Sequence, residues 1–205
     1  MNNSWNKIIY KVGAPLYDRV FNSGMFLTAR KHVFQNIHLE KRDKILFVGV
    51  GTGADLELIS NLDLNITAID YSKAMLDKAR MKFINEPITF IEMDAQSLKF
   101  ENGSFDYIFA SLILSVVPNP DLCLQEMTRV LKTDGKIIIF DKFASPNKKT
   151  SLLKKIIISI IKVFGTDISL VFEKIFQPFA KKLKIEEDTP IMLNGMYRKI
   201  VIRKR

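Results

Sequence analysis

The sequence predicts an α/β protein with one mostly parallel β-sheet, helices on both faces, and an antiparallel hairpin at the C-terminal end. Three observations support this prediction. Short β-branched runs alternate with helical segments from Lys44 to Phe140, as in successive βαβ units. A glycine-rich turn directly follows the first of these runs. Asn194-Gly195, a dipeptide typical of tight hairpins, lies between two short apolar runs within 190–205.

The elements of the predicted sheet follow one another in a regular order. The strands are expected at 44–49, 65–70, 87–92, 105–110 and 136–141. Helices are expected between them, at about 54–61, 72–84 and 120–132. Asp134-Gly135 has the residue types of a turn that leads into the last strand. Because crossovers between parallel strands are right-handed, these helices should cover both faces of the sheet.

The whole chain, 1–205, is expected to form a single domain. Its 205 residues, 47% of them apolar, are enough to build one sizeable core. Within it, 1–42 is interpreted as an N-terminal helical cap, 43–148 as the sheet core, and 149–205 as a helical insertion followed by the terminal hairpin. Further helices are expected at 4–12 and 16–37, and in two pieces, parted near Gly165, over 150–183.

The sequence favours a cytoplasmic protein. Its single cysteine, Cys123, can form no internal disulfide, and the first twenty residues lack an apolar run that ends in a small-residue cleavage site. The most apolar window, 152–164, is interrupted by three lysines. It therefore falls short of the roughly 20 apolar residues that cross a bilayer.

The net charge of +9 is concentrated at the two ends of the chain. Residues 1–42 carry +5 and 149–205 carry +8, whereas 43–148 carry −4. Apolar residues also recur at helical spacing in these ends. Two interpretations stay open: the apolar faces pack on the sheet, or the ends make reversible, peripheral contact with the anionic inner face of a membrane. The apolar positions are Trp5, Ile8, Ile9, Val12, Leu153, Ile156, Ile157, Ile160, Ile161, Phe164, Ile168, Val171, Phe172, Ile175, Phe176 and Phe179.

The segment VGVGTGAD, residues 48–55, joins the first predicted strand to a helix. Its three glycines permit a sharp turn and let a ligand press against the backbone, while the following helix offers unpaired N–H groups. Asp70 ends the second strand, where its carboxylate can accept both hydroxyls of a ribose. The pattern predicts an adenosine cofactor, bound by the turn residues Gly49, Val50, Gly51, Thr52 and Gly53 together with Asp70.

A second acid at a strand end narrows the choice of cofactor. The spacing of Gly49, Gly51 and Ala54 also fits dinucleotide enzymes, so the turn alone leaves a nicotinamide reductase open. Asp94 and Ala95 follow the third strand, where an acid can accept from an adenine amino group in the same crevice. Nicotinamide dehydrogenases have no routine need for a carboxylate there, so a different adenosine cofactor is favoured.

Five segments in order resemble the motifs of class I S-adenosylmethionine-dependent methyltransferases. They are ILFVGVGTGADL, AIDYSKAMLDKAR, FIEMDAQSLKF, FDYIFASLILS and EMTRVLKTDGKIIIFD, and they span about half of the chain. The resemblance implies a Rossmann-like fold, 43–148 as the cofactor-binding core, S-adenosyl-L-methionine as cofactor, and methyl transfer as the activity. It further implies that Gly49, Gly51 and Gly53 face the methionine part, Asp70 the ribose, Tyr71 and Met75 the adenine face, Asp94 and Ala95 the adenine edge, and Ser111 the site floor.

The chain departs from this family pattern at Phe47. Many members have an acid two residues before the first glycine, which supports the ammonium group of the cofactor. Asp55 lies just past the turn and has two interpretations. It either replaces the missing acid electrostatically, or it is an acid in the first helical turn that interacts favourably with the helix dipole.

The methyl acceptor is interpreted from the outer segments. The stretch SLILSV at 111–116 lacks the Asn/Asp-Pro-Pro-aromatic sequence that adenine and cytosine N-methyltransferases share, so nucleic acid is not expected. YDRVF, VGVGTGADL, FDKF and GTDISLVFEKI resemble bacterial phosphatidylethanolamine N-methyltransferases, and the Tyr-Asp start also resembles quinone-ring C-methyltransferases of ubiquinone and menaquinone biosynthesis. The expected acceptor is a small molecule or a lipid, first the amine of phosphatidylethanolamine and alternatively a quinone ring. A non-catalytic adenosylmethionine-binding module is the competing class.

An amine acceptor must lose a proton before it can attack. With a pKa near 10, exposing its lone pair at pH 7 costs about 4 kcal/mol. The candidate catalytic residues are Tyr17, Asp18 and Asp141, the last at the end of the fifth strand. Each also has a structural interpretation: an aromatic cap, a helix-start acid and a solvated strand end. His32 and His38 lie six residues apart, a spacing that does not place them on one helix face, and neither is paired with Cys or clustered acids, so no metal site is expected.

Overall fold

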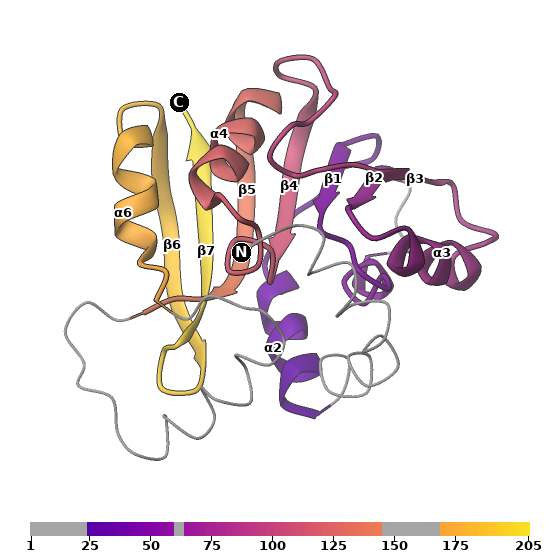
Figure 1. The fold of residues 1–205 in the computed structure, drawn as a ribbon, viewed down its shortest axis with the longest axis horizontal. Coiled ribbons are helices and arrows are strands. Elements are labelled where there is room, and N and C mark those ends of the chain that lie inside the picture. The colour runs from indigo at the N-terminus through magenta and orange to yellow at the C-terminus, as the bar shows by residue number, and fades with distance from the viewer. Residues whose placement is uncertain (1–23, 60–63, 145–168) are drawn as a thin grey trace.

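The computed structural model describes residues 24–59, 64–144 and 169–205. These residues form one seven-stranded sheet in the order β3-β2-β1-β4-β5-β7-β6 (Figure 1). The first five strands are parallel, and β7 runs antiparallel to both of its neighbours. The strands are β1 (Lys44–Val48), β2 (Asn65–Asp70), β3 (Ile88–Glu92), β4 (Phe105–Ser111), β5 (Leu131–Lys142), β6 (Leu183–Met192) and β7 (Tyr197–Lys204). The predicted fold class and the terminal hairpin are confirmed.

Helices connect the strands close to where the sequence predicted them. They are α2 (Gly24–Phe34), η1 (Leu56–Leu58), α3 (Lys73–Lys82), α4 (Pro120–Val130), α6 (Phe172–Phe176) and η2 (Gln177–Phe179). At the start of α4, the Asn119 side chain accepts a hydrogen bond from Leu122 N at 3.1 Å, and Pro120 occupies the first turn. Since an N-cap side chain and an early proline both favour helix initiation, this start is fixed by local sequence.

Two predicted helices differ from the structure. The described part of 54–61 contains only the three-residue 3₁₀ helix η1. In 150–183, the described residues contain the short α6 and η2, and β6 begins at Leu183. The residues before position 169 in that prediction lie outside the described part of the chain, as does 4–12.

The last parallel strand is longer than predicted. β5 begins at Leu131, opposite Phe105, and its register with β4 shifts before Lys136 pairs with Tyr107. The predicted turn lies inside this irregularity, with Asp134 at a φ of 62°. A Cβ on Gly135 would lie 2.8 Å from the carbonyl oxygen of Asp106, so close approach to β4 requires a glycine here.

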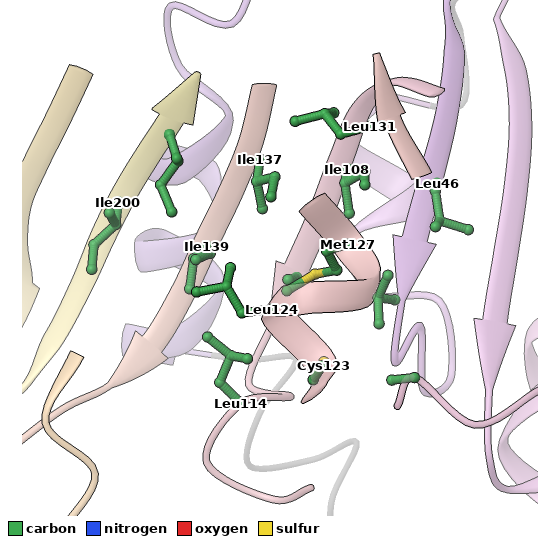
Figure 2. Packing of buried hydrophobic residues seen from close by; sticks show 14 of the residues in the cluster. Leu46, Ile108, Leu114, Cys123, Leu124, Met127, Leu131, Ile137, Ile139 and Ile200 are labelled. Carbon is green, nitrogen blue, oxygen red and sulfur yellow. The ribbon is translucent and has the colours of Figure 1, made fainter. Parts of the chain in front are cut away.

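Apolar cores fill both faces of the sheet. On one face, Leu124 and Met127 of α4 pack over Ile108 of β4 and over Ile137 and Ile139 of β5 (Figure 2). On the other face, the core includes residues of α2 and the stacked rings of Phe47 and Phe109, whose centroids are 4.9 Å apart. Figure 1 shows α2 near the carboxyl ends of β4 and β5.

The described part of the C-terminal amphipathic segment packs on the sheet. Phe172 and Ile175 are buried in the core beneath α4, and Phe176 and Phe179 pack partly against it. The packing interpretation is therefore correct for these four positions. The amphipathic positions at 5–12 and 153–168 lie outside the described residues. Within the described ranges, the structure has no helix that is long and apolar enough to cross a membrane.

Candidate functional site

The glycine turn begins where β1 ends and is fastened to β2. Gly49 N and Val50 N both donate to the carbonyl oxygen of Ile69, each at 2.9 Å. Gly49, Gly51 and Gly53 have positive φ angles of 71°, 57° and 85°, a region that side chains disfavour. The local sequence therefore produces the sharp turn that was predicted.

The three glycines have different surroundings. A Cβ on Gly49 would lie 2.7 Å from Cδ1 of Ile113, and one on Gly53 would lie 2.7 Å from a ring carbon of Phe83. A Cβ on Gly51 would meet no atom within 4 Å. Packing thus demands glycine at the first and third positions, whereas the second borders open space. A ligand can approach the backbone at Gly51.

Asp70 connects the end of β2 to this turn. Its Oδ2 accepts a hydrogen bond from Gly51 N at 2.8 Å, and its Oδ1 accepts one from Ser72 N at 2.8 Å. Burial raises the pKa of Asp70, and the N–H groups of Ser72, Gly51 and Tyr71 oppose that rise. A carboxylate oxygen has two lone pairs, so these two bonds leave capacity to accept hydroxyl groups as well.

A pocket of about 460 Å³ lies beside the ends of β2 and β3. Asp94 lines it, and its Oδ1 accepts hydrogen bonds from Gln96 N at 2.9 Å and Gln96 Nε2 at 3.0 Å. Met93 N donates to the carbonyl oxygen of Asp70 at 3.0 Å, which joins the two strand ends. The lining residues are Tyr71, Glu92, Met93, Asp94, Ser97 and Lys99.

Of the predicted cofactor residues, Tyr71 and Asp94 line this pocket, whereas Met75, Ala95 and Ser111 are among those that do not. Met75 and Ala95 are buried, Met75 on α3 and Ala95 in the core beneath α4. Ser111 ends β4 and pairs with Phe140 of β5. The structure brings Tyr71 and Asp94 together in the lining of the pocket. Asp70, which precedes Tyr71, is joined to Gly51 by a hydrogen bond.

Asp55 forms a buried ion pair that sequence reasoning missed. Arg30 Nη1 of α2 donates to Asp55 Oδ1, and both residues are almost fully buried. Asp55 precedes η1, but its side chain makes no capping hydrogen bond. No local pattern in α2 marks Arg30, because its partner lies 25 residues further along the chain.

At the end of β5, Asp141 is fully buried, so its interpretation as a solvated strand end is wrong. Its Oδ2 accepts from Ser115 N at 3.1 Å and its Oδ1 from Lys142 N at 2.8 Å. Burial raises the pKa of Asp141, and the nearby Lys142 ammonium opposes that rise. The Ser115 hydroxyl is buried without a hydrogen-bond partner among the described residues. The other catalytic candidates, Tyr17 and Asp18, lie outside the described residues.

Metal binding has no support in the described geometry. Across 24–59, 64–144 and 169–205, no group of three or more His, Cys, Asp or Glu residues could hold a metal ion. The thiol of Cys123 is buried in α4, and this burial raises its pKa. The carboxylates of Asp70 and Asp94, near the open space at Gly51, can accept hydrogen bonds from a hydroxyl- and amino-bearing ligand such as adenosine.

Comparison with known proteins places this geometry in a family. Residues 46–139 match the model of a methyltransferase domain. The chain is 31% identical to the phosphatidylethanolamine N-methyltransferase of Cereibacter sphaeroides over 166 residues, which cover 79% of this chain and 80% of the relative. It is 35% identical to the demethylmenaquinone methyltransferase of Staphylococcus haemolyticus over 134 residues, 61% of this chain and only 55% of that relative.

Solved structures share the fold. An S-adenosylmethionine-dependent methyltransferase from Thermotoga maritima superimposes with a TM-score of 0.72 at 18% identity, over 98% of this chain and all of the other. At this identity the likeness supports the architecture of the sheet alone.

Proposed function

We propose that this chain, which belongs to the class I S-adenosylmethionine-dependent methyltransferases, methylates a lipid-borne acceptor, first the amine of phosphatidylethanolamine. The cofactor assignment depends on one observation: Gly51, Asp70 and the pocket at Asp94 follow one another along the carboxyl ends of β1, β2 and β3. Crevices at this edge of an open α/β sheet are where such folds bind ligands. The acceptor assignment depends on the relative from Cereibacter sphaeroides, which this chain matches over most of its length.

The residues of the three strand ends fit S-adenosylmethionine part by part. The open space at Gly51 admits the methionyl part, Asp70 accepts hydrogen bonds from the ribose hydroxyls, and Tyr71 and Asp94 contact the adenine in the pocket. When bound, the cofactor supplies an electrophilic methyl group on a sulfonium sulfur. The leaving thioether is neutral, so the protein's task is to align the acceptor and to exclude water.

Methylation of an amine also requires a group that accepts the proton of the acceptor's ammonium. An ammonium headgroup becomes a nucleophile only after its proton has left, and Tyr17 and Asp18 are the proposed acceptors of that proton. Asp141 stays in this proposal. Its full burial and its two backbone hydrogen bonds favour a role through the loop that carries Ser115 over direct contact with the headgroup.

Reversible contact with anionic membranes is part of the same proposal. Lys174, Lys181, Lys182 and Lys184 are exposed on the C-terminal part of the chain. Each basic residue near an anionic surface contributes about 1 kcal/mol of attraction. We expect the protein to float with anionic vesicles at low salt and to leave them at high salt. Equal, negligible flotation with zwitterionic and anionic vesicles would contradict the proposed membrane contact.

A labelling experiment tests the acceptor. The full chain is incubated with methyl-labelled S-adenosylmethionine and vesicles that contain either phosphatidylethanolamine or a demethylated quinone. We expect label in the phosphatidylethanolamine headgroup. Label in the quinone would favour the second candidate, which the 35% identity to the menaquinone enzyme supports. Cofactor binding without transfer to either lipid, or to any other amine or quinone, would favour the non-catalytic module.

A further inference from the structure

A second pocket lies on the face of the sheet that carries α2. Its lining includes Ile138 of β5 and Val201 of β7, which belong to the same apolar core as Val33 of α2. Among the described residues, it has no lining residue in common with the pocket at Asp94. Strands β3 and β6, which each line one of the two pockets, form the two edges of the sheet (Figure 1). The second pocket has a volume of about 260 Å³. This space holds a small molecule, because it corresponds to about nine water molecules of about 30 Å³ each.

The chain that follows α2 forms one wall of this pocket. Asn36 has a φ of 63°, a left-handed conformation that asparagine adopts more readily than most residues and that commonly ends helices. The hydroxyl of Tyr107 in β4 donates a hydrogen bond to the carbonyl oxygen of His38 at 3.0 Å. The ammonium of Lys199 in β7 donates to the carbonyl oxygen of Gln35 at 3.4 Å. Two side chains of the sheet thus hold this wall in place.

A bulge in the edge strand β6 forms another wall. The register of β6 with β7 shifts between Ile185 and Glu187, so Glu186 is an additional residue in the strand. Consecutive side chains of a regular strand point to opposite faces of a sheet. The bulge interrupts this alternation, and Glu186 and Glu187 both line the pocket. Two adjacent acids therefore border one small space.

Two lysines of the neighbouring strands line the same pocket and pair with these acids. Lys199 Nζ lies 2.9 Å from Glu187 Oε2, and Lys136 Nζ of β5 lies 3.0 Å from Glu186 Oε2. Lys199 is only 4% exposed, so its charge carries a desolvation penalty. An ammonium has three N–H donors, and a carboxylate has about four lone-pair sites. One ion pair each therefore leaves both kinds of group with capacity for hydrogen bonds to a ligand.

We propose that this pocket is a second ligand site, which binds a small zwitterion that carries an ammonium group and a carboxylate or phosphate group. A purely anionic ligand would meet Glu186 and Glu187, and a purely cationic ligand would meet both lysines. Because like charges in contact cost free energy, only a ligand with both charges complements the two ion pairs. Its anionic group accepts hydrogen bonds from Lys136 and Lys199, and its ammonium donates to the two carboxylates. The side chain of Ile138 offers an apolar surface to the carbon atoms between the charges.

Matched small molecules test the requirement for both charges. β-Alanine and phosphoethanolamine each join an ammonium group to an anionic group through two carbons, whereas propionate lacks the ammonium and ethanolamine lacks the anion. Each is titrated calorimetrically into the full chain, with and without adenosylhomocysteine. We expect at least one zwitterion to bind about tenfold more tightly than propionate and ethanolamine in both conditions. Tighter binding of β-alanine identifies a carboxylate ligand, and tighter binding of phosphoethanolamine identifies a phosphate ligand.

Variants of the pocket locate the binding. Lys136→Met and Glu186→Gln should each weaken the preferred zwitterion by about tenfold, the effect of losing a charge-assisted hydrogen bond. Both side chains are partly exposed, at 33% and 26%, so we expect these variants to fold. Lys199→Met should weaken the same ligand at a buried position. Lys132→Met is the matched control, because it breaks an ion pair with Asp106 and neither residue lines the pocket. It should leave the affinity unchanged.

Three results would overturn the site. Propionate or ethanolamine affinity equal to that of the zwitterions would show that both charges are not required. Unchanged zwitterion affinity in the pocket variants would place the binding elsewhere, for example at the methyl-acceptor site. Absence of binding by both zwitterions would leave the pocket as a surface hollow held by ion pairs. None of these results requires methyl transfer, so failure of the proposed function is recognised separately, by its own labelling experiment.

Discussion

Two acids at strand ends, Asp70 of β2 and Asp141 of β5, have the same local chemistry in different settings. Each carboxylate accepts two backbone N–H groups, one of them from a neighbouring loop, and burial raises the pKa of each. Asp70 is linked to the open turn beside the pocket, whereas Asp141 has no solvent exposure at all. From this comparison we expect a strand-end acid to contact a ligand only where the surrounding chain leaves space for it.

The largest expected difference between the two acids is in ligand binding. Asp70→Ala should abolish most of the stabilisation that adenosylhomocysteine gives the wild type, about 2.7 kcal/mol at a ligand concentration of 100 Kd. Asp141→Ala is the matched control, because it also removes two backbone hydrogen bonds and should keep the ligand effect. The measurement is the melting temperature with and without ligand. Loss of the effect in both variants would contradict the distinction.

The open space at Gly51 gives a second, smaller contrast. Gly51→Ala places a methyl group where we expect the cofactor, so adenosylhomocysteine should bind about tenfold more weakly or worse. Gly103→Ala tests backbone strain alone, since Gly103 has a similar φ of 65° and its added Cβ would meet only the Cα of Lys132, at 3.9 Å. Both variants should lose about 1–2 kcal/mol of stability. Titration that shows equal affinities in the two variants would place the ligand away from Gly51.

The buried acid, Asp141, should affect the stability of the fold and the pH dependence of that stability. Asp141→Asn leaves one of two N–H groups facing an amide NH₂, so we expect a loss of about 1–3 kcal/mol in the free energy of unfolding. The folded-state pKa of Asp141 is raised above the ordinary value of 3.8. Between these two pKa values the folded protein therefore binds more protons than the unfolded chain. The contribution of Asp141 to the free energy of unfolding consequently falls as the pH rises from 3.8 through the folded-state pKa. Denaturant unfolding from pH 4 upward should show a flatter pH dependence in Asp141→Asn. An unchanged slope would contradict the assigned shift.

The difference between these two regions also explains what the sequence could predict. The glycine turn, Asp70 and Asp94 directly follow strands that are recognisable by their apolar runs, so their place at one edge of the sheet follows from strand order. Arg30 and Ser115 came to light only in the structure, because each meets its partner through packing of segments 25 and 26 residues apart. No local pattern encodes such contacts.

The terminal hairpin begins earlier than predicted. The predicted helical segment 150–183 ends where β6 (Leu183–Met192) begins, and the part of this strand before Pro190 was not predicted. Exposed and less exposed residues alternate along this strand, a period that the run LKIEEDTPIM already contains in part. Antiparallel pairing with β7 extends along this strand from Leu183 to Met192.

The most direct test of the central claim, that the strand ends of β1, β2 and β3 bind S-adenosylmethionine, is a thermal denaturation of the full chain with adenosylhomocysteine and, separately, with NADH. A ligand that binds only the native state raises the melting temperature in proportion to its concentration relative to Kd. The account predicts a rise with adenosylhomocysteine and none with NADH. A rise with NADH and none with adenosylhomocysteine would contradict it.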